Sequence, residues 1–239
     1  MKKISLLVLL ITSVTFAQNW GKNKVQGNGK VQSQIKTTTQ YDEISCSGPF
    51  SVQLIADKEG KIEIEGDENL LNLIIVEVEN DKLKVSIEKG TWFDMRGDKI
   101  KITIPIEKIS RIEFGGSGDL KTRDKIVTEN LEIYLSGSGS IDATTNAVAL
   151  KTVLSGSGTI DLKGTTENFD AKLSGSGRIV CKKLNSQNTI ALLSGSGSID
   201  LNCTKSLNAK ISGSGTINYS GNPTNVIKKV SGSGEIIRM

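Results

Sequence analysis

Two observations in the sequence predict an all-β fold, namely a right-handed parallel β-helix (β-solenoid). A Ser-Gly-Ser-Gly tetrapeptide recurs at intervals of 21, 19, 19, 20, 18 and 19 residues, and a fixed period of this size is typical of repeat architectures. Between the copies, apolar and polar residues alternate with the two-residue period of a β-strand. The copies are Gly-Gly-Ser-Gly at residues 115–118 and tetrapeptides that begin at Ser136, Ser155, Ser174, Ser194, Ser212 and Ser231.

Counted from the first residue of each tetrapeptide, odd offsets are apolar and face inward, whereas even offsets face outward. The column five residues later shows this most clearly, with Leu120, Ile141, Ile160, Ile179, Ile199, Ile217 and Ile236. The glycines share the inward parity without a side chain, which predicts a tight corner, and the serines face outward. At ~3.3 Å per residue the coil perimeter is at most ~60 Å, and coils stack ~4.8 Å apart. The alternative is an antiparallel β-sandwich or prism with one hairpin per repeat, which lacks paired turn signals.

The chain divides into a leader and one continuous β domain. Residues 1–17 combine Lys2 and Lys3, an apolar stretch and a small-residue cleavage site at Ala17, the pattern of a signal peptide. Residues 18–30 are expected to be a flexible lead-in, residues 31–114 irregular β coils or an N-terminal cap, and residues 115–239 the regular solenoid. Residues 46–50 resemble a decayed corner, and residues 67–73 predict a helical turn with Asp67 as N-cap. The last turn carries Lys228 and Arg238 in inward columns, where charge blunts an exposed edge.

Composition excludes several functions. The two leader lysines account for half of the formal net charge of +4, and a nearly neutral mature chain argues against nucleic acid as the partner. Histidine is absent, which removes Ser-His and Cys-His nucleophile pairs and His-ligated zinc. The cysteines, Cys46, Cys181 and Cys203, are too few for a disulfide framework and are expected to be small buried apolar residues. No second hydrophobic stretch follows the leader, so no transmembrane segment is expected in the mature chain.

The sequence also resembles a known family. Residues 25–29 (Val-Gln-Gly-Asn-Gly), 44–52 (Ile-Ser-Cys-Ser-Gly-Pro-Phe-Ser-Val) and 64–70 (Ile-Glu-Gly-Asp-Glu-Asn-Leu) precede the repeated SGSG-x-[IL] pattern, and residues 215–218 read Gly-Thr-Ile-Asn. This order is similar to the bacterial family "putative auto-transporter adhesin, head GIN domain" over nearly all of residues 25–237. The resemblance implies an exported β-helical domain of the bacterial cell envelope with an adhesive role. It brings no catalytic or binding residues with it.

The outward serines are the first candidate binding surface. They form two parallel columns, in which small hydroxyls either satisfy backbone groups at the corners or present a lattice to a periodic partner such as a glycan chain. The candidate residues are Ser136, Ser138, Ser155, Ser157, Ser174, Ser176, Ser194, Ser196, Ser212 and Ser214.

A second candidate is the outward column six residues after each tetrapeptide, with Asp142, Asp161 and Asp200. Neighbouring carboxylates repel each other unless a cation or a lysine lies between them. Solvated carboxylates are the simplest interpretation, weak Ca²⁺ binding at Asp142 and Asp161 is the next, and a pair of catalytic acids is a third. No other cofactor is expected.

A third candidate lies in residues 90–98, where Trp92 and Phe93 precede Arg96-Gly97-Asp98. The aromatic pair either closes the end of the coil or contacts a partner, and the tripeptide is a short match with little information.

The sequence therefore favours a non-catalytic exported protein of the periplasm or outer surface, which binds an envelope glycan or protein through an extended solenoid face. The alternatives are a polysaccharide-binding or polysaccharide-acting β-helix protein and a purely structural envelope component.

Overall fold

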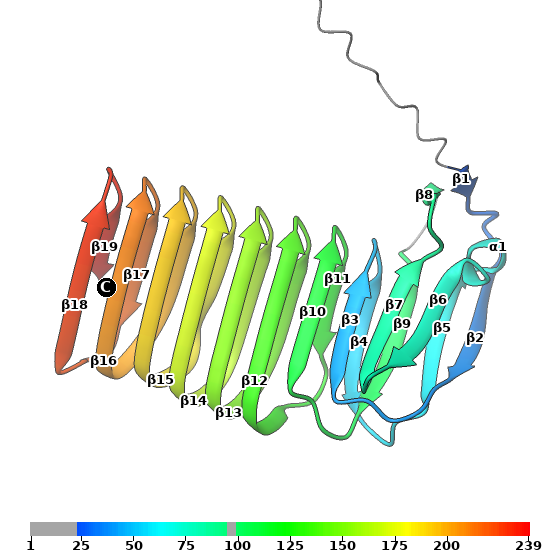
Figure 1. Cartoon of the computed structure of the whole chain (residues 1–239), viewed down its shortest axis with the longest axis horizontal. Helices are drawn as coiled ribbons and strands as arrows, with labels where there is room; N and C mark the ends of the chain where they lie inside the picture. The colour runs from blue at the N-terminus through cyan, green and yellow to red at the C-terminus, as the bar shows by residue number, and fades with distance from the viewer. Residues whose placement is uncertain (1–22, 95–98) are drawn as a thin grey trace, which may run out of the picture.

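The computed structural model describes residues 23–94 and 99–239, which form one elongated β-solenoid (Figure 1). The solenoid has about 7 turns with ~19 residues per turn, which confirms the predicted all-β repeat fold. The leader at residues 1–17 and the Arg96-Gly97-Asp98 tripeptide lie outside the described residues.

The described part of the N-terminal half contains ten short strands and one helical turn. They are β1 (Asn23–Gln26), β2 (Val31–Thr37), β3 (Glu43–Ser47), β4 (Ser51–Ala56), β5 (Lys61–Asp67), α1 (Glu68–Leu71), β6 (Ile74–Glu79), β7 (Lys82–Ile87), β8 (Thr91–Asp94), β9 (Lys101–Ile106) and β10 (Arg111–Gly116). The regular half contains longer strands. They are β11 (Asp119–Thr122), β12 (Ile126–Gly137), β13 (Ser140–Gly156), β14 (Thr159–Gly175), β15 (Arg178–Gly195), β16 (Ser198–Gly213), β17 (Thr216–Ser220), β18 (Asn225–Ser231) and β19 (Glu235–Arg238).

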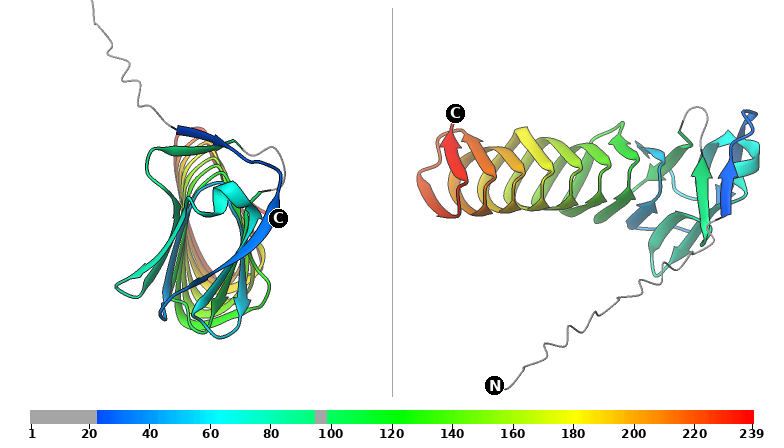
Figure 2. Two further views of the ribbon diagram at one scale, coloured as in Figure 1. Left: turned by 90° about the vertical axis from the view of Figure 1, so that its right-hand side faces the viewer. Right: turned by 90° about the horizontal axis from the view of Figure 1, so that it is seen from above.

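Each regular coil is a flattened ring with two faces. A long strand such as β13 begins after one tetrapeptide, runs along one face, bends at the far edge and returns along the other face to the next tetrapeptide (Figure 2). All pairings between β12, β13, β14, β15 and β16 are parallel, as in Ile141 with Ile160 and Ser155 with Ser174. The antiparallel sandwich is therefore wrong for the repeat, because its hairpins would reverse these pairings.

Unequal repeat lengths are absorbed at a distance from the tetrapeptides. The register between β14 and β15 shifts between Asp161 and Lys163, and that between β15 and β16 shifts at Cys181 and Ser186. Beyond the shifts, Ser174 pairs with Ser194 and Ser194 with Ser212. The tetrapeptides therefore stay aligned although their spacing along the chain varies.

The core follows the predicted inward columns. Ile141, Ile160, Ile179 and Ile199 stack on one another and are at most 1% exposed. The three cysteines are buried and unpaired within this core. Repetition of the same side chain in each coil buries it above and below its copies, so each coil depends on its neighbours for stability.

The N-terminal half continues the stack and then departs from it. Strands β3 and β4 pair in parallel with β10 and β11, and Gly48 donates its N–H to the Gly115 carbonyl at 3.0 Å, so residues 46–50 form a corner of the stack. Beyond them β2 pairs with β5, β5 with β9 and β6 with β7 in antiparallel fashion. Asp67 is the N-cap of α1, as expected, but its side chain makes no capping hydrogen bond. Residues 23–26 differ from the expected flexible lead-in, because they form β1 and pair with β8.

Candidate binding surface

The tetrapeptides form the turns along one edge of the solenoid. Each incoming strand ends at the first glycine and the next begins after the second. In the turn that contains Ser157, the backbone N–H groups of Ser157 and Gly158 both donate to the Gly137 carbonyl of the preceding coil at 3.0 Å. Likewise, the N–H groups of Ser138 and Gly139 donate to the Gly116 carbonyl at 3.1 and 3.0 Å. The turn conformation is therefore held by backbone hydrogen bonds.

Both glycines are required by the shape of the turn. Gly156 has a φ of 125°, a conformation that residues with a Cβ rarely adopt. A Cβ on Gly158 would lie 2.5 Å from the Gly139 carbonyl oxygen and 2.9 Å from Leu135 Cδ2. The prediction of a tight, inward-facing corner is thus explained by direct contact between coils.

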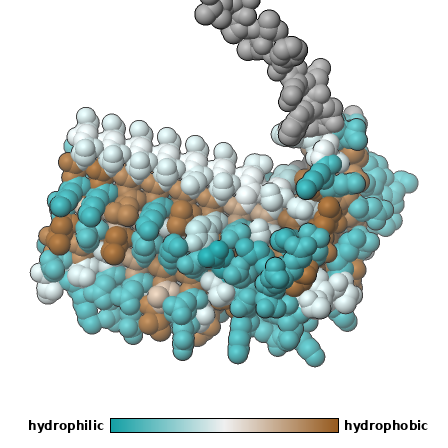
Figure 3. All heavy atoms as spheres, in the orientation of Figure 1, coloured by the Kyte–Doolittle hydropathy of each residue, from teal (hydrophilic) through white to brown (hydrophobic). Residues whose placement is uncertain are grey.

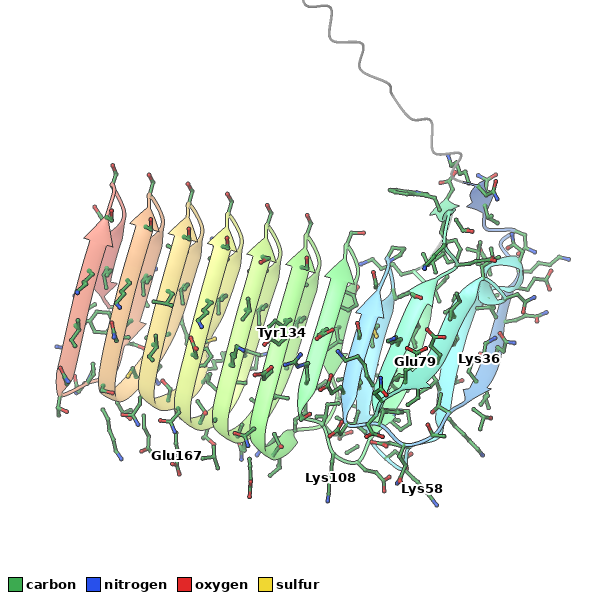
Figure 4. All side chains as sticks on the ribbon, viewed as in Figure 1. Lys36, Lys58, Glu79, Lys108, Tyr134 and Glu167 are labelled. Atoms are coloured by element: carbon green, nitrogen blue, oxygen red, sulfur yellow. The ribbon has the colours of Figure 1, made fainter. Side chains whose placement is uncertain are left out.

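The serines have no such structural requirement. Their side chains form a continuous row along the turn edge, seen as the pale band at the top of Figure 3 and as outward sticks in Figure 4. Within the described chain, their hydroxyls make no hydrogen bond to another protein group, so they do not satisfy the corner backbone. We name these ten exposed residues the serine edge: Ser136, Ser138, Ser155, Ser157, Ser174, Ser176, Ser194, Ser196, Ser212 and Ser214.

Serine recurs from coil to coil more regularly than the residues of another exposed column. Four residues before each tetrapeptide stand Glu132, Lys151, Asp170, Ile190 and Asn208. These residues also pair in register and face outward, yet their chemistry changes from coil to coil. Common origin of the repeats therefore does not by itself account for ten retained hydroxyls.

The aspartate column is partly neutralised. Asp142 and Asp161 are register partners on adjacent coils, and Lys163 Nζ lies 2.8 Å from Asp142 Oδ1. The hydrogen bond from Lys163 to Asp142, reinforced by the charge of Asp161, raises the pKa of Lys163 against the opposing effect of burial. Lys163 is therefore paired with Asp142, and Asp161 acts on it through its charge. Within residues 23–94 and 99–239, no group of three or more His, Cys, Asp or Glu side chains is arranged to hold a metal ion.

Asp200 does not continue this pair. It is 7% exposed and accepts a hydrogen bond from Asn218 Nδ2 at 2.7 Å. Its register partner on the preceding coil is Val180. The three aspartates therefore form one pair and one separate buried residue.

The aromatic pair is divided between core and surface. Phe93 is 6% exposed and packs in the core, whereas Trp92 is 58% exposed on β8. Figure 1 shows β8 at the N-terminal end, beyond the regular coils. The two aromatic residues therefore differ in burial, and both the closing role and the partner contact remain predictions.

A network of charged side chains surrounds Tyr134 and was not predicted from the sequence. Arg111 and Lys151, on the two adjacent coils, lie 5.1 and 5.3 Å from the centroid of the Tyr134 ring. Glu132 accepts hydrogen bonds from Tyr134 at 2.8 Å, from Lys151 at 3.3 Å and from Arg111. Tyr134 marks the broad face that points toward the viewer in Figure 4. Arg111 and Lys151 lie 23 and 17 residues from Tyr134 along the chain, so only the coil register places them beside it.

The same broad face carries an open groove of about 410 Å³ across β12–β16 and β18. One side is an asparagine column six residues before the tetrapeptides, with Asn130, Asn168, Asn188 and Asn225. Asparagine occupies this offset in four of the six repeats, and this recurrence is the sequence signal that could have located the groove. Together the surfaces present hydroxyls, amides and paired charges on a β-solenoid.

The chain belongs to the family "Putative auto-transporter adhesin, head GIN domain", which matches residues 40–223. This confirms the resemblance seen in the sequence. Among curated proteins none matches the chain. No described helix is long and apolar enough to cross a membrane.

Solved structures share the fold. A putative adhesin from Bacteroides fragilis NCTC 9343 is 27% identical with a TM-score of 0.83, covering 90% of this chain and 100% of that chain. A putative lipid binding protein from Parabacteroides distasonis ATCC 8503 is 25% identical with a TM-score of 0.75, covering 91% and 100%. A putative adhesin from Parabacteroides merdae ATCC 43184 shows the fold at 23% identity and a TM-score of 0.70, covering 91% and 99%.

Proposed function

We propose that this protein is a non-catalytic, exported binding scaffold of the bacterial cell envelope, and that the serine edge is its adhesive surface. The family and the adhesin-named structural relatives support a binding role. The observation that carries the assignment to the serine edge is the absence of any protein hydrogen bond to its ten hydroxyls in the described chain. The fold requires the glycines of each turn but not the serine hydroxyls.

The geometry of the edge suits a partner with repeating polar groups. Each hydroxyl both donates and accepts hydrogen bonds, and neighbouring coils repeat it at ~4.8 Å. A single exposed hydrogen bond contributes little, so affinity has to come from many simultaneous contacts. An envelope glycan or an extended protein surface provides such a series of contacts.

Export is part of the proposal. The basic start, apolar stretch and small-residue site of residues 1–17 are those of a signal peptide. An exported chain meets envelope polymers directly, in the periplasm or on the outer surface. Detection of the mature N-terminus at Gln18 in an envelope or extracellular fraction tests this part.

Polysaccharide cleavage is the weaker alternative. It requires a pair of acids about 5–9 Å apart that act on opposite sides of the bond. Asp142 and Asp161 are adjacent, but Lys163 bonds to the first of them on an open strand face. If Asp142→Asn together with Asp161→Asn abolished cleavage of an envelope glycan, the non-catalytic assignment would be wrong.

Capture from envelope extracts tests the binding role. Immobilised protein is compared with a variant in which the ten serines are alanine and with a control variant that carries Thr165→Ala and Gln187→Ala at the opposite edge. We expect wild type and control to retain the same glycan or protein partner, and the serine variant to lose it. Lipid vesicles form a second arm, because one structural relative is named a putative lipid binding protein. Equal retention by all three proteins would assign the edge a purely structural role.

A further inference from the structure

The last strand at the N-terminal end of the solenoid has one open edge. In the described chain, β2 pairs in antiparallel fashion with β5 and with no other strand. Figures 1 and 2 show β2 at this end of the molecule, beyond β5 and away from the regular coils. An edge strand presents backbone N–H and carbonyl groups to any other strand that can pair with them.

Hydrogen bonds at the two ends of β2 show which of its backbone groups face the open edge. Glu68 donates its N–H to the Lys30 carbonyl at 2.9 Å, and Thr38 donates its N–H to the Gly60 carbonyl at 3.0 Å. Both pairs continue the register of β2 with β5, and hydrogen-bonded pairs alternate along an antiparallel ladder. Even-numbered residues of β2 therefore bond to β5. The residues that turn their N–H and carbonyl groups to the open edge are Val31, Ser33, Ile35 and Thr37.

The side chains of these odd-numbered residues are exposed as well. Val31 and Ile35 are both 63% exposed, and Ser33 between them is also exposed. Both apolar residues are β-branched, the type that packs well against a neighbouring strand. The same positions of β2 thus offer open backbone groups and apolar side chains to a second strand.

The sequence of this strand is symmetric about Ser33. Residues 30–36 read Lys-Val-Gln-Ser-Gln-Ile-Lys, so their chemical pattern is the same in both directions. If two copies pair in antiparallel fashion about a two-fold axis at Ser33, Val31 lies opposite Ile35 of the second copy, and each glutamine lies opposite a glutamine. Cross-strand pairs of β-branched residues stabilise a sheet. The register that joins the open backbone groups therefore also joins the apolar side chains, and the partner that fits this edge is a second copy of it.

The lysines at the ends of the symmetric pattern limit the strength of this pairing. Lys30 lies opposite Lys36 of the second copy, and like charges directly opposite each other destabilise a sheet. Glu68 offsets part of this repulsion, because its carboxylate lies 3.6 Å from Lys30 Nζ and accepts a hydrogen bond from Gln32 at 2.9 Å. One pair of strands also buries less than the ~1,600 Å² of a standard interface. The contact is therefore weak, reversible and strengthened by salt.

We propose that β2 is the interface of a homodimer, in which two copies join end to end through antiparallel β2 strands with the two-fold axis at Ser33. The same surface of each copy forms the contact, so the assembly closes at two copies. The dimer does not depend on the proposed function, because the serine edge lies on the regular coils. A foreign peptide is the less suitable partner, because only a strand with matching apolar positions pairs with both Val31 and Ile35.

Sedimentation velocity over a range of protein and salt concentrations tests the dimer. We expect a monomer–dimer equilibrium that shifts toward the dimer as salt screens the lysine pairs. Ser33→Pro removes an N–H that only the second copy would use, and Ile35→Lys replaces an apolar contact with a charge. Each variant should stay monomeric at concentrations where the wild type is dimeric. Val127→Lys is the control, because it changes an exposed aliphatic side chain on β12, and unfolding curves verify that all variants fold.

Cysteine cross-linking tests the register of the two strands. Ser33→Cys brings two thiols together at the axis, where Cα atoms of a hydrogen-bonded pair lie ~5.5 Å apart, a distance that a disulfide spans. Thr37→Cys is the matched control, because this edge residue lies ~26 Å from its own copy across the axis. The native cysteines are buried and unpaired, so they leave the result clear. We expect an intermolecular disulfide on oxidation in Ser33→Cys and not in Thr37→Cys.

Reversal of one charge provides a gain-of-affinity test. Lys36→Glu places a carboxylate opposite Lys30 of the second copy in both symmetric pairs, and should tighten the dimer about five-fold. The proposal is overturned if the wild type stays monomeric under all conditions, or if Ser33→Pro and Ile35→Lys leave the dimer unchanged. It is also overturned if Thr37→Cys cross-links as readily as Ser33→Cys, or if wild-type oligomers grow beyond two copies.

Discussion

Lys228 Nζ lies 4.7 Å from the centroid of the Tyr219 ring, over the open C-terminal end of the solenoid. Lys228 occupies an inward column, since its register partner Ala209 is buried. Its ammonium group also donates to the Ile236 carbonyl at 3.2 Å. In the same coil Val226 and Val230 are 38% and 46% exposed, because no described coil covers them. The lysine thus places a charge where another coil would otherwise stack.

Replacement of this lysine should promote self-association. Lys228→Val makes the inward column of the last coil fully apolar, so we expect sedimentation velocity to show larger oligomers than those of the wild type. Lys229→Val is the control, because it removes the same charge from the adjacent outward position. If neither variant associates more than the wild type, inward charge does not protect this end.

Adjacent residues of one turn should differ sharply in their effect on stability. Gly158→Ala places a Cβ 2.5 Å from the Gly139 carbonyl oxygen and should lower the free energy of unfolding by about 1–3 kcal/mol. Ser157→Ala should change it by less than about 0.5 kcal/mol, because the exposed hydroxyl makes no hydrogen bond in the described chain. Denaturant unfolding of the two variants measures both values. A large loss in Ser157→Ala would show that the hydroxyl stabilises the turn.

Acid should weaken the network around Tyr134. Burial opposes the ionisation of Glu132, but hydrogen bonds from Tyr134, Lys151 and Arg111 outweigh it and lower the pKa of this carboxyl. A lowered folded-state pKa contributes stability above the unfolded-state value of about 4.3 and loses it as the pH falls through the folded-state value. We therefore expect the unfolding temperature to fall below about pH 4, and to fall less steeply in Glu132→Gln. Identical pH profiles would exclude this carboxyl as a source of acid sensitivity.

The cysteines should be inert in the folded protein. Burial raises the pKa of the Cys46 thiol to about 12 and also raises that of Cys181. Because all three thiols are buried and the thiolate is the reactive form, iodoacetamide at neutral pH should label none of them until denaturant is added. Mass spectrometry of the labelled protein counts the modified thiols. Rapid labelling without denaturant would contradict the close packing of the core.

Calcium should have little effect on stability. Lys163 already compensates Asp142, so addition of about 1 mM Ca²⁺, the upper range for weak extracellular sites, should leave the unfolding temperature unchanged. Lys163→Met leaves Asp142 and Asp161 facing each other and provides the comparison. A calcium-dependent rise in the unfolding temperature of the wild type would support the Ca²⁺ site at Asp142 and Asp161 that the sequence suggested.

The sequence pattern was sufficient to predict the regular coils, but it did not predict the strand pairing of the N-terminal cap or the groove. The Ile141 column and the tetrapeptide period determine strand direction and register, because each position repeats in the next coil. The antiparallel pairing of β2 with β5 follows no repeat and depends on contacts specific to that end. The groove escaped notice because Asp170 and Asn208 become neighbours of Ile190 only through register. The serines were correctly predicted to face outward, but only the structure shows that their hydroxyls make no hydrogen bond within the described chain.

A graded serine series tests the central claim most directly. The serine pairs of the edge, from Ser136 with Ser138 to Ser212 with Ser214, are replaced by alanine in one, two, three, four or all five coils. Retention of each variant on isolated envelopes is then measured beside its unfolding curve. An edge that acts collectively predicts stepwise loss of retention with each added coil, whichever coils are chosen, and no change in unfolding. Undiminished retention with all ten serines replaced, or complete loss on replacement of one particular pair, would contradict it.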